Sequence, residues 1–468
     1  MEKTHNSTIF LHLSTFASHS AMRSAVSCFA PVCVAPRPAL RRHPRRRRPL
    51  RSTRWTVAAS QTRNEESQPD GPDTPSSEPI PQSKRRYINI TGFPFPLTPL
   101  FSRKTVCNTL VINKIWTFEQ EQGIGLGLGV STSVVMTVVR MEDGKLWVHD
   151  PIAPTVELLD LLRLHCGDSS GTAIDVKYIV LATTQYEHKI FVAPFSRKFP
   201  NAEVWIAPGQ FSFPVNLPNQ FFGIFPTGYL DAVGSNMPWS SEIEQKLLRL
   251  PPLFWNQYTY CECAFLVKST GTLIVTDAAV FVSENPPKII EDDLLTDLGD
   301  ENGFTIGLLR FGNYRGGRNL PGAGVTRKEG PEICKITGWN RMALFSLFIA
   351  PDAKNILQPK NSFDGLRNKF VVSPIVFAVV FQFHRKLVWN WASSIQHDWG
   401  DSTNQIVSGH FPSYSGQKKG EAVGKFVEAF EWANSDDKKP KEYVDSNDLK
   451  SLELVVNVLR FLKAVPEE

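Results

Sequence analysis

Apolar residues fall into short runs separated by turn residues, and these runs predict a mixed α/β protein. Leu110–Glu119, Ser133–Met141 and Lys145–His149 are rich in β-branched and aromatic residues and predict strands. Asp143-Gly144 lies between the last two and is typical of a hairpin turn. Val176–Leu181 is a continuous apolar run, which indicates a strand buried on both faces.

Helical patterns alternate with these strands. Thr155 can cap a helix that runs to His165, with Gly167 as its stop. Pro194–Phe199 predicts a second, short helix, and Glu203–Ile206 a further strand. The order strand, helix, strand, helix, strand favours an α/β protein built in layers.

The second half of the chain continues this alternation. The capping-box pattern at Ser241–Glu244 predicts a helix to Leu250, and Tyr258–Lys268 with Thr272–Thr276 predict a hairpin around Gly271. The polar, Gly-rich stretch Asn285–Lys335 is expected to be irregular. The remaining predictions are one late strand, Gln405–Ser408, and four helices, Trp339–Phe348, Val376–Ala392, Glu421–Trp432 and Asp448–Ala464.

Composition agrees with a globular protein and excludes a fibrous or wholly disordered one. Of the 468 residues, 42% are apolar and 21% charged. The longest apolar run, Val371–Phe383, is too short to cross a bilayer, so we expect no transmembrane segment.

The net charge of +5 is unevenly distributed. Residues 1–64 hold 12 Lys and Arg with one acid, which leaves 39 basic and 45 acidic residues in the rest of the chain. Because the expected folded part is mildly acidic, it lacks the excess positive charge of a nucleic-acid-binding surface. We therefore expect no nucleic-acid partner.

The basic first segment has the composition of an organelle-targeting sequence, rich in Ser, Thr, Ala and Arg. Its Arg41–Arg48 block also allows a nuclear interpretation. We expect residues 1–60 to be a plastid transit peptide that directs the protein to the chloroplast stroma. A disordered linker at 61–86, one domain at 87–435, and a linker with an amphipathic helix at 436–468 would follow.

Three further features are open to a functional or a structural interpretation. Cys261 and Cys263 would face the same side of a strand, as metal or redox thiols or as small core residues. The glycines at 123, 125, 127 and 129 lack phosphate-loop spacing and favour a strand edge or turn. The aromatic stretch Ala207–Trp239 can be a packed Ω-like loop, a lid, a protein-partner surface or a membrane contact.

Polar residues follow three of the predicted strands. Strand Tyr178–Ala182 is followed by the segment TTQYEHK at 183–189, and the two later strands by Asp277 and by His410. This order resembles the metallo-β-lactamase superfamily, in which a His-x-His-x-Asp-His loop, a bridging Asp and a final His hold two zinc ions. Thr184 and Tyr186 occupy the positions of its first two histidines, His188 that of the Asp and Lys189 that of the last His.

Longer stretches resemble the domain of unknown function 4336 family of photosynthetic organisms. The stretches that carry the resemblance are Leu146–Thr155, Tyr186–Lys189, Pro194–Arg197, Val204–Gln210, Val275–Ala278, Gly338–Met342 and His410-Phe411. The resemblance implies a four-layer αβ/βα sandwich of divergent metallo-β-lactamase type. The chain departs from the family where Pro412-Ser413-Tyr414 follows His410-Phe411.

Three functions are compatible with this set of residues. The first, which the sequence favours because one or two histidines and a carboxylate cannot hold two zinc ions, is a binding or scaffold protein that has lost the dinuclear zinc site and needs no cofactor. The second is a hydrolase that uses one zinc, manganese or iron ion held by His188, Asp277 and His410. In that case Tyr186 or Glu187 would transfer protons. The third is metal-free acid–base or thiol chemistry at Glu187–Lys189 or at the cysteine pair, so whether the protein is an enzyme is left open.

Overall fold

The computed structural model describes residues 81–88, 97–123, 130–167, 173–212, 216–232, 234–311, 314–348, 351–434, 444 and 446–466, all of which belong to one compact unit. The expected transit peptide, most of the expected linker and the glycines at 125, 127 and 129 lie outside these residues. Gln82–Arg85, at the end of the expected linker segment, forms a 3-10 turn, η1.

A seven-stranded sheet is formed by the first half of the described chain. Its strands follow the order of the sequence, antiparallel from β1 to β4 and parallel from β4 to β7. They are β1 Thr105–Val111, β2 Ile115–Gly123, β3 Ser131–Arg140, β4 Leu146–His149, β5 Val176–Leu181, β6 Glu203–Ile206 and β7 Gly228–Tyr229. The single strand predicted over Leu110–Glu119 is wrong, because Asn113 at φ +58° makes a hairpin turn within it.

A five-stranded sheet with the order β14-β13-β10-β9-β8 is built from the second half. Its strands are β8 Ile243–Arg249, β9 Cys261–Val267, β10 Thr272–Ile274, β13 Gln405–Val407 and β14 Tyr414–Ser415. The helix predicted from Ser241 to Leu250 is wrong. Ile243 and Gln245 point inward on alternate positions and pair with β9, so strand pairing overrides the local capping signal.

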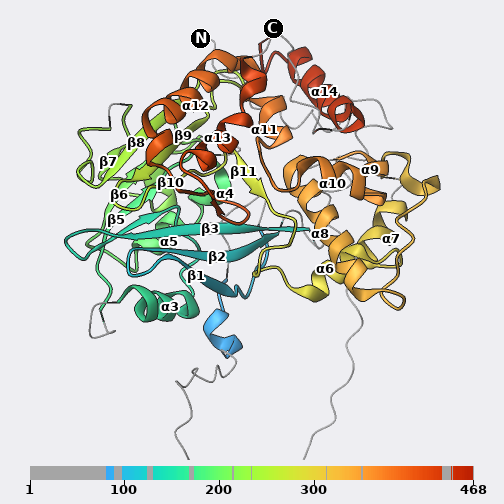
Figure 1. Cartoon of the computed structure of the whole chain (residues 1–468), viewed down its shortest axis with the longest axis horizontal. Coiled ribbons are helices and arrows are strands. Elements are labelled where there is room, and N and C mark those ends of the chain that lie inside the picture. Colours follow the sequence, from blue (N-terminus) through green and yellow to red (C-terminus); the bar gives the residue numbers. More distant parts are fainter. Residues whose placement is uncertain are drawn as a thin grey trace, which may run out of the picture. The chain divides into compact units, whose positions relative to one another are not determined.

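The two sheets pack face to face, with helices on both outer faces. Trp147 and Val180 of the large sheet meet Cys263 and Phe265 of the small one in the central core. The outer face of the large sheet packs against α3 (Val156–Cys166) and α5 (Val192–Ser196). The outer face of the small sheet is covered by the later helices. These four layers, visible in Figure 1, confirm the predicted αβ/βα sandwich.

The stretch expected to be irregular, Asn285–Lys335, is largely helical. It contains α6 Asp292–Gly299, α7 Phe304–Phe311 and the 3-10 turn η3 Tyr314–Asn319, and it runs into α8 Pro331–Phe348, which begins eight residues before the predicted helix. Buried Arg341 of α8 ties this region together by donating to the carbonyls of Leu298 and Ile356 and to Glu301. The sequence of this region shows no periodic apolar pattern, because some of the side chains that are buried here are polar.

The remaining helices complete the outer layer and the helical region beside it (Figure 1). They are α9 Ala353–Leu357, α10 Lys360–Leu366, α11 Pro374–Val379, η4 Phe381–His384, α12 Arg385–Trp399, α13 Glu421–Glu428, η6 Glu431–Ala433 and α14 Ser446–Phe461, with a small ribbon of β11 Val280–Val282 and β12 Lys369–Val371. The helix predicted over Val376–Ala392 is interrupted at Val380. Within the described residues, no helix combines the length and apolarity needed to span a membrane.

Candidate metal centre

The candidate site lies where strands of both sheets end. β10 and β13 run parallel with Ile274 opposite Val407, so Asp277 and His410 each follow three residues after a paired strand end. His188 lies in α4 (Tyr186–Lys189), which follows β5 of the other sheet. Because neighbouring parallel strands end at the same edge, Asp277 and His410 lie close together. A backbone bridge between Thr183 and Glu262 of β9 brings the segment that follows β5, and with it His188, to the same edge.

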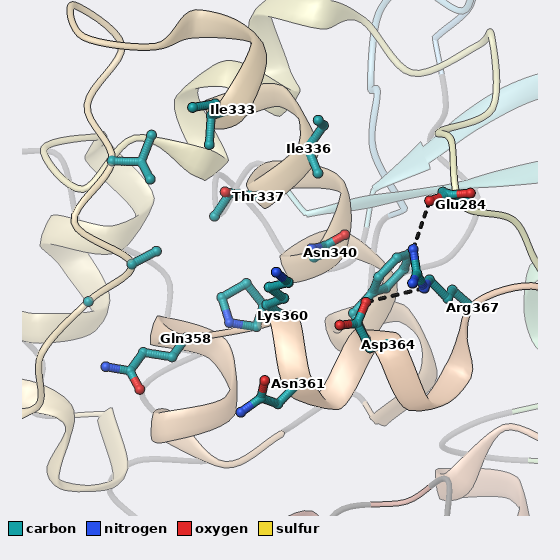
Figure 2. Close-up of a pocket in the computed structure, with 15 residues that line it drawn as sticks. Glu284, Ile333, Ile336, Thr337, Asn340, Gln358, Lys360, Asn361, Asp364 and Arg367 are labelled. Carbon is teal, nitrogen blue, oxygen red and sulfur yellow. Dashed lines mark hydrogen bonds and ion pairs between the residues drawn. The ribbon is translucent and has the colours of Figure 1, made fainter.

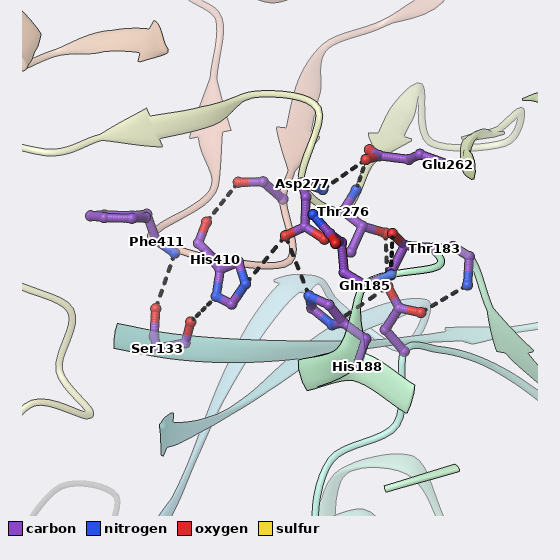
Figure 3. Close-up of polar contacts among 12 residues, drawn as sticks. Ser133, Thr183, Gln185, His188, Glu262, Thr276, Asp277, His410 and Phe411 are labelled. Atoms are coloured by element: carbon purple, nitrogen blue, oxygen red, sulfur yellow. Dashed lines mark hydrogen bonds and ion pairs between the residues drawn. The ribbon is translucent and has the colours of Figure 1, made fainter. Parts of the chain in front are cut away.

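Four of the side chains named from the sequence form one cluster. Ligand-type atoms of Glu187, His188, Asp277 and His410 all lie within 4.8 Å of one another. One carboxylate oxygen of Asp277, Oδ1, lies 3.4 Å from His188 Nε2 and 3.2 Å from His410 Nε2. Figure 3 shows Asp277 between the two imidazoles.

The orientation of His410 is set by the large sheet. Its Nδ1 lies 2.6 Å from the carbonyl oxygen of Ser133, which can only accept, so Nδ1 carries the proton. The backbone N–H of Phe411 donates to the Ser133 hydroxyl, and Gly409 accepts from Val135. Nε2 of His410 therefore faces the Asp277 carboxylate, where it can donate a hydrogen bond when protonated or direct its lone pair at a cation between the two groups.

His188 is enclosed between two carboxylates. Its side chain is 1% exposed, with Nδ1 at 3.8 Å from Asp150 Oδ2 and Nε2 without a hydrogen-bond partner. Burial by itself would lower the pKa of His188, but Asp277, Asp150 and Glu187 together raise it to about 10. Gly409 leaves room for the ring, because a Cβ there would lie 2.9 Å from His188 Cε1.

Asp277 is held by a carboxylate from the neighbouring strand. Glu262 of β9 accepts from the backbone N–H groups of Thr276 and Asp277 through its two oxygens, and also from the Tyr260 hydroxyl. Burial and the nearby Asp277 raise the pKa of Glu262 to about 7. Burial alone would raise the pKa of Asp277 too, but His188 and His410 hold it well below its usual range. Asp277 Oδ2 has no hydrogen-bond partner.

The fourth member of the cluster, Glu187, is partly buried beside Asp277. Burial and the like charge of Asp277 raise the pKa of the Glu187 carboxyl. The raised pKa favours the protonated carboxyl, which can donate a proton, whereas the ionised form can bind a cation.

The other residues named from the sequence face elsewhere. Buried Lys189 donates to the Phe211 carbonyl and to Ser212, and burial lowers the pKa of its ammonium to about 8. Tyr186 packs beside Ile190 and Phe191, and burial raises the pKa of its phenol to about 12. Thr184 donates to the carbonyl of Thr259. Three of the positions that hold metal ligands in a dinuclear site therefore carry side chains that make other contacts in this protein.

Sequence reasoning missed Asp150 as well as Glu262. Asp150 has φ +47°, accepts from the backbone N–H of Ala182 in one sheet and from the Thr276 hydroxyl of the other, and so joins the two sheets at the site. A signal was present for both. Asp150 follows a predicted strand as the proposed ligands do, and Glu262 is a carboxylate within an otherwise apolar strand.

The donor set fits one cation. Two imidazole nitrogens and one carboxylate converge, two of the buried ligand atoms lack hydrogen bonds, and a second carboxylate lies within reach. Single catalytic zinc sites use three such ligands and leave one position open. In the part of the chain that the structure describes, this is the one cluster of that kind. Cys261 and Cys263 instead lie fully buried in the core between the sheets, and burial raises the pKa of Cys261 to about 12.

Comparison with known proteins identifies a family and similar folds. The model of the family described as "Domain of unknown function (DUF4336)" matches residues 112–364 and 357–432. No curated protein matches. Solved structures with similar folds include the DIM-1 metallo-β-lactamase exposed to ceftazidime, with 9% identity, a TM-score of 0.35, and coverage of 70% of this chain and 98% of that one.

Two cyanobacterial proteins also match. The metal-soaked Flv1 flavodiiron core from Synechocystis is 8% identical with a TM-score of 0.36, over 71% of this chain and 61% of that one. A putative diflavin flavoprotein fragment from Nostoc is 11% identical with a TM-score of 0.36, over 71% and 96%. The fold assignment is supported by the strand order and the layers of this structure. It does not depend on the similarity to these solved structures.

Proposed function

Because this chain belongs to the family described as a domain of unknown function, DUF4336, we propose its function from the site itself: a hydrolase that uses a single divalent metal ion. His188, Asp277 and His410 would hold the ion. The substrate would be an ester, thioester or phosphodiester, and zinc, manganese and iron are the metals to test.

One observation carries this proposal. The Ser133 carbonyl accepts from Nδ1 of His410, so Nε2, the ring nitrogen left to bind a metal, faces a carboxylate oxygen that also lies beside His188 Nε2. Without a cation, His188 would carry a proton, because the surrounding carboxylates raise its pKa to about 10. A bound cation would take the place of that proton and would also lie against Nε2 of His410. With a cation, all three donor atoms are satisfied at once.

The chain's own residues have separate roles in this proposal. A bound ion of this kind lowers the pKa of water and so supplies hydroxide near neutral pH. Ser133 and Glu262 orient His410 and Asp277, respectively. Glu187, whose pKa is raised, would hold a proton for the leaving group.

A binding or scaffold role without an ion is the second candidate. It is favoured by the contacts of Thr184, Tyr186 and Lys189. Their side chains interact with other parts of the protein and therefore supply no ligands for a second ion. The exposed fractions of Asp277 and His410 are only 7% and 13%, so access to the site is narrow. A protein-partner surface at loop 207–239 belongs to this candidate.

Metal analysis separates the two candidates. The protein is produced without a His-tag, reconstituted with zinc, manganese or iron, desalted and measured by mass spectrometry. The hydrolase proposal expects about one ion per chain in the wild type and in His397→Ala, an exposed histidine outside the site. It expects none in His188→Ala or His410→Ala. A stoichiometry near zero in the wild type, or retention in either site variant, contradicts the proposal.

Activity then tests the role of Glu187. Metal-loaded protein is assayed with p-nitrophenyl acetate, an acyl thioester and bis-p-nitrophenyl phosphate. Glu187→Gln is expected to keep the ion and lose turnover, because the amide cannot exchange a proton. Loss of the ion in Glu187→Gln would instead make Glu187 a ligand. A metal-loaded wild type without activity on any of the three would favour a structural ion.

A plastid location is proposed from composition alone. The support is the Arg-rich, acid-poor segment 1–64. A fluorescent fusion of residues 1–64 is expected to enter chloroplasts in leaf cells, and a diffuse cytosolic or nuclear signal would contradict the proposal.

A further inference from the structure

A hollow away from the metal cluster lies between helices α8 and α10. It encloses about 590 Å³, which is within the range of small-molecule sites. Figure 2 shows Ile333, Ile336 and Asn340 of α8 on one wall and Lys360 and Asp364 of α10 on the other. None of the residues that form the metal cluster lines this hollow.

One wall of the hollow presents two largely exposed apolar side chains. Ile333 and Ile336 lie one helical turn apart and are 56% and 60% exposed. Phe363, which is buried, also lines this hollow. An exposed apolar stripe that borders a concave surface is typical of a ligand site rather than of a solvated helix face.

The next turn of α8 brings in a buried amide. Asn340 is 7% exposed, and its Oδ1 has no hydrogen-bond partner in the described part of the chain. Buried side-chain acceptors without a partner are rare in native proteins, because such a group loses its bonds to water. Asn340 therefore offers an acceptor to a ligand that carries an N–H or O–H group.

One cationic side chain at the hollow is available to pair with a ligand. Two acidic and two basic residues line the hollow, and Arg367 pairs with both acids, Glu284 and Asp364, at 2.7 and 3.2 Å. The exposed ammonium of Lys360 makes no ion pair or hydrogen bond with any residue that the structure describes. A negatively charged group on a ligand would supply the missing partner.

We propose that this hollow binds a small amphipathic organic anion. Its apolar or aromatic body would contact Ile333 and Ile336, one N–H or O–H group would donate to Asn340 Oδ1, and a carboxylate, sulfonate or phosphate would pair with Lys360. This inference does not depend on the metal-site proposal.

The test uses two fluorescent probes that differ in one group. 1-Anilinonaphthalene-8-sulfonate has an aromatic body, an N–H and an anionic group, and N-phenyl-1-naphthylamine lacks only the sulfonate. Each is titrated into the full chain, with and without EDTA. We expect saturable binding of one molecule of the sulfonate probe per chain, unchanged by EDTA.

Variants assign the contacts. Ile336→Asp is expected to weaken binding of both probes about tenfold, and to fold as the wild type does because the side chain of Ile336 is 60% exposed. Lys360→Ala is expected to weaken the sulfonate probe about threefold and to leave the naphthylamine unchanged. Asn340→Ala is expected to weaken both without lowering the melting temperature, because its Oδ1 makes no bond in the free protein.

A control separates this hollow from other exposed apolar groups. Phe221 and Phe225 are 72% and 68% exposed and do not line the hollow. Phe221→Ser with Phe225→Ser is expected to leave saturable binding unchanged. Binding that survives Ile336→Asp, is lost in the double phenylalanine variant, or shows equal sensitivity of both probes to Lys360→Ala overturns the proposal.

Discussion

Replacing Glu262 with Gln tests whether a carboxylate behind the cluster positions Asp277. Both oxygens of Glu262 accept from backbone N–H groups, at 2.9 Å from Thr276 and 3.0 Å from Asp277. A glutamine has one acceptor oxygen and one NH₂ group. Either orientation of the amide therefore places the NH₂ against a backbone N–H, leaves that buried donor unpaired and removes one charge-assisted bond.

The expected cost follows from that loss. A hydrogen bond to a charged group contributes about 1.5–3 kcal/mol, so Glu262→Gln should lower the free energy of unfolding by about that amount. Because the displaced backbone carries Asp277, metal affinity should fall roughly 10- to 100-fold, as for other residues that orient metal ligands. Urea unfolding followed by tryptophan fluorescence and titration with a competing chelator measure the two effects.

Tyr260→Phe is the matched control. It removes one hydroxyl that donates to the same carboxylate and leaves both backbone bonds in place. It should keep metal affinity within about threefold of the wild type, since Asp277 is not displaced. Two outcomes would show that the bonds from Glu262 to the backbone do not position Asp277. In the first, Glu262→Gln unfolds at the wild-type urea concentration and binds metal as tightly as the wild type. In the second, Tyr260→Phe lowers stability and metal affinity as much as Glu262→Gln does.

Three further predictions concern packing and pH. Gly409→Ala should abolish metal binding and lower the free energy of unfolding in urea by about 1–3 kcal/mol. The reason is that the new Cβ would lie 2.9 Å from both His188 Cε1 and Thr276 Cγ2. A normal metal content would contradict this prediction. Burial raises the pKa of Glu119 to about 7, so the folded state favours its protonated form. The contribution of Glu119 to stability should be greatest below pH ~4.5 and fall by about 3 kcal/mol as the pH rises to ~7, and Glu119→Gln should remove this part of the slope while leaving the part that Glu262 contributes. Arg341→Met should destabilise by about 3–5 kcal/mol, since Glu301 and several carbonyls lose their buried partner; a wild-type midpoint would contradict this.

Strands and helices with a strong local signal could be predicted from the sequence. Glu203–Ile206 is observed with the predicted bounds, and Thr155 caps its helix by accepting from Leu158. Both patterns depend on neighbours along the chain, namely apolar alternation and a capping hydroxyl. Ile243–Arg249 was predicted as a helix because its capping signal is local, while the partner strand that decides its conformation comes later in the chain.

For the candidate site, the sequence by itself determined which candidate ligands follow strands and in what order. These are His188, Asp277 and His410, and the matching positions of a dinuclear set hold Thr184, Tyr186 and Lys189 instead of histidines. Residues that follow neighbouring parallel strands are predicted to lie close together, because such strands end at the same edge of a sheet. This prediction requires no atomic detail.

Only the tertiary structure decided what each of these side chains faces. Lys189 follows His188 directly, yet its ammonium bonds to the 207–239 loop, and the His410 tautomer depends on Ser133, 277 residues earlier. Asp150 and Glu262 act through backbone N–H groups whose positions arise when two sheets pack together. Such contacts are set by long-range packing, so neither residue spacing nor local propensity contains them.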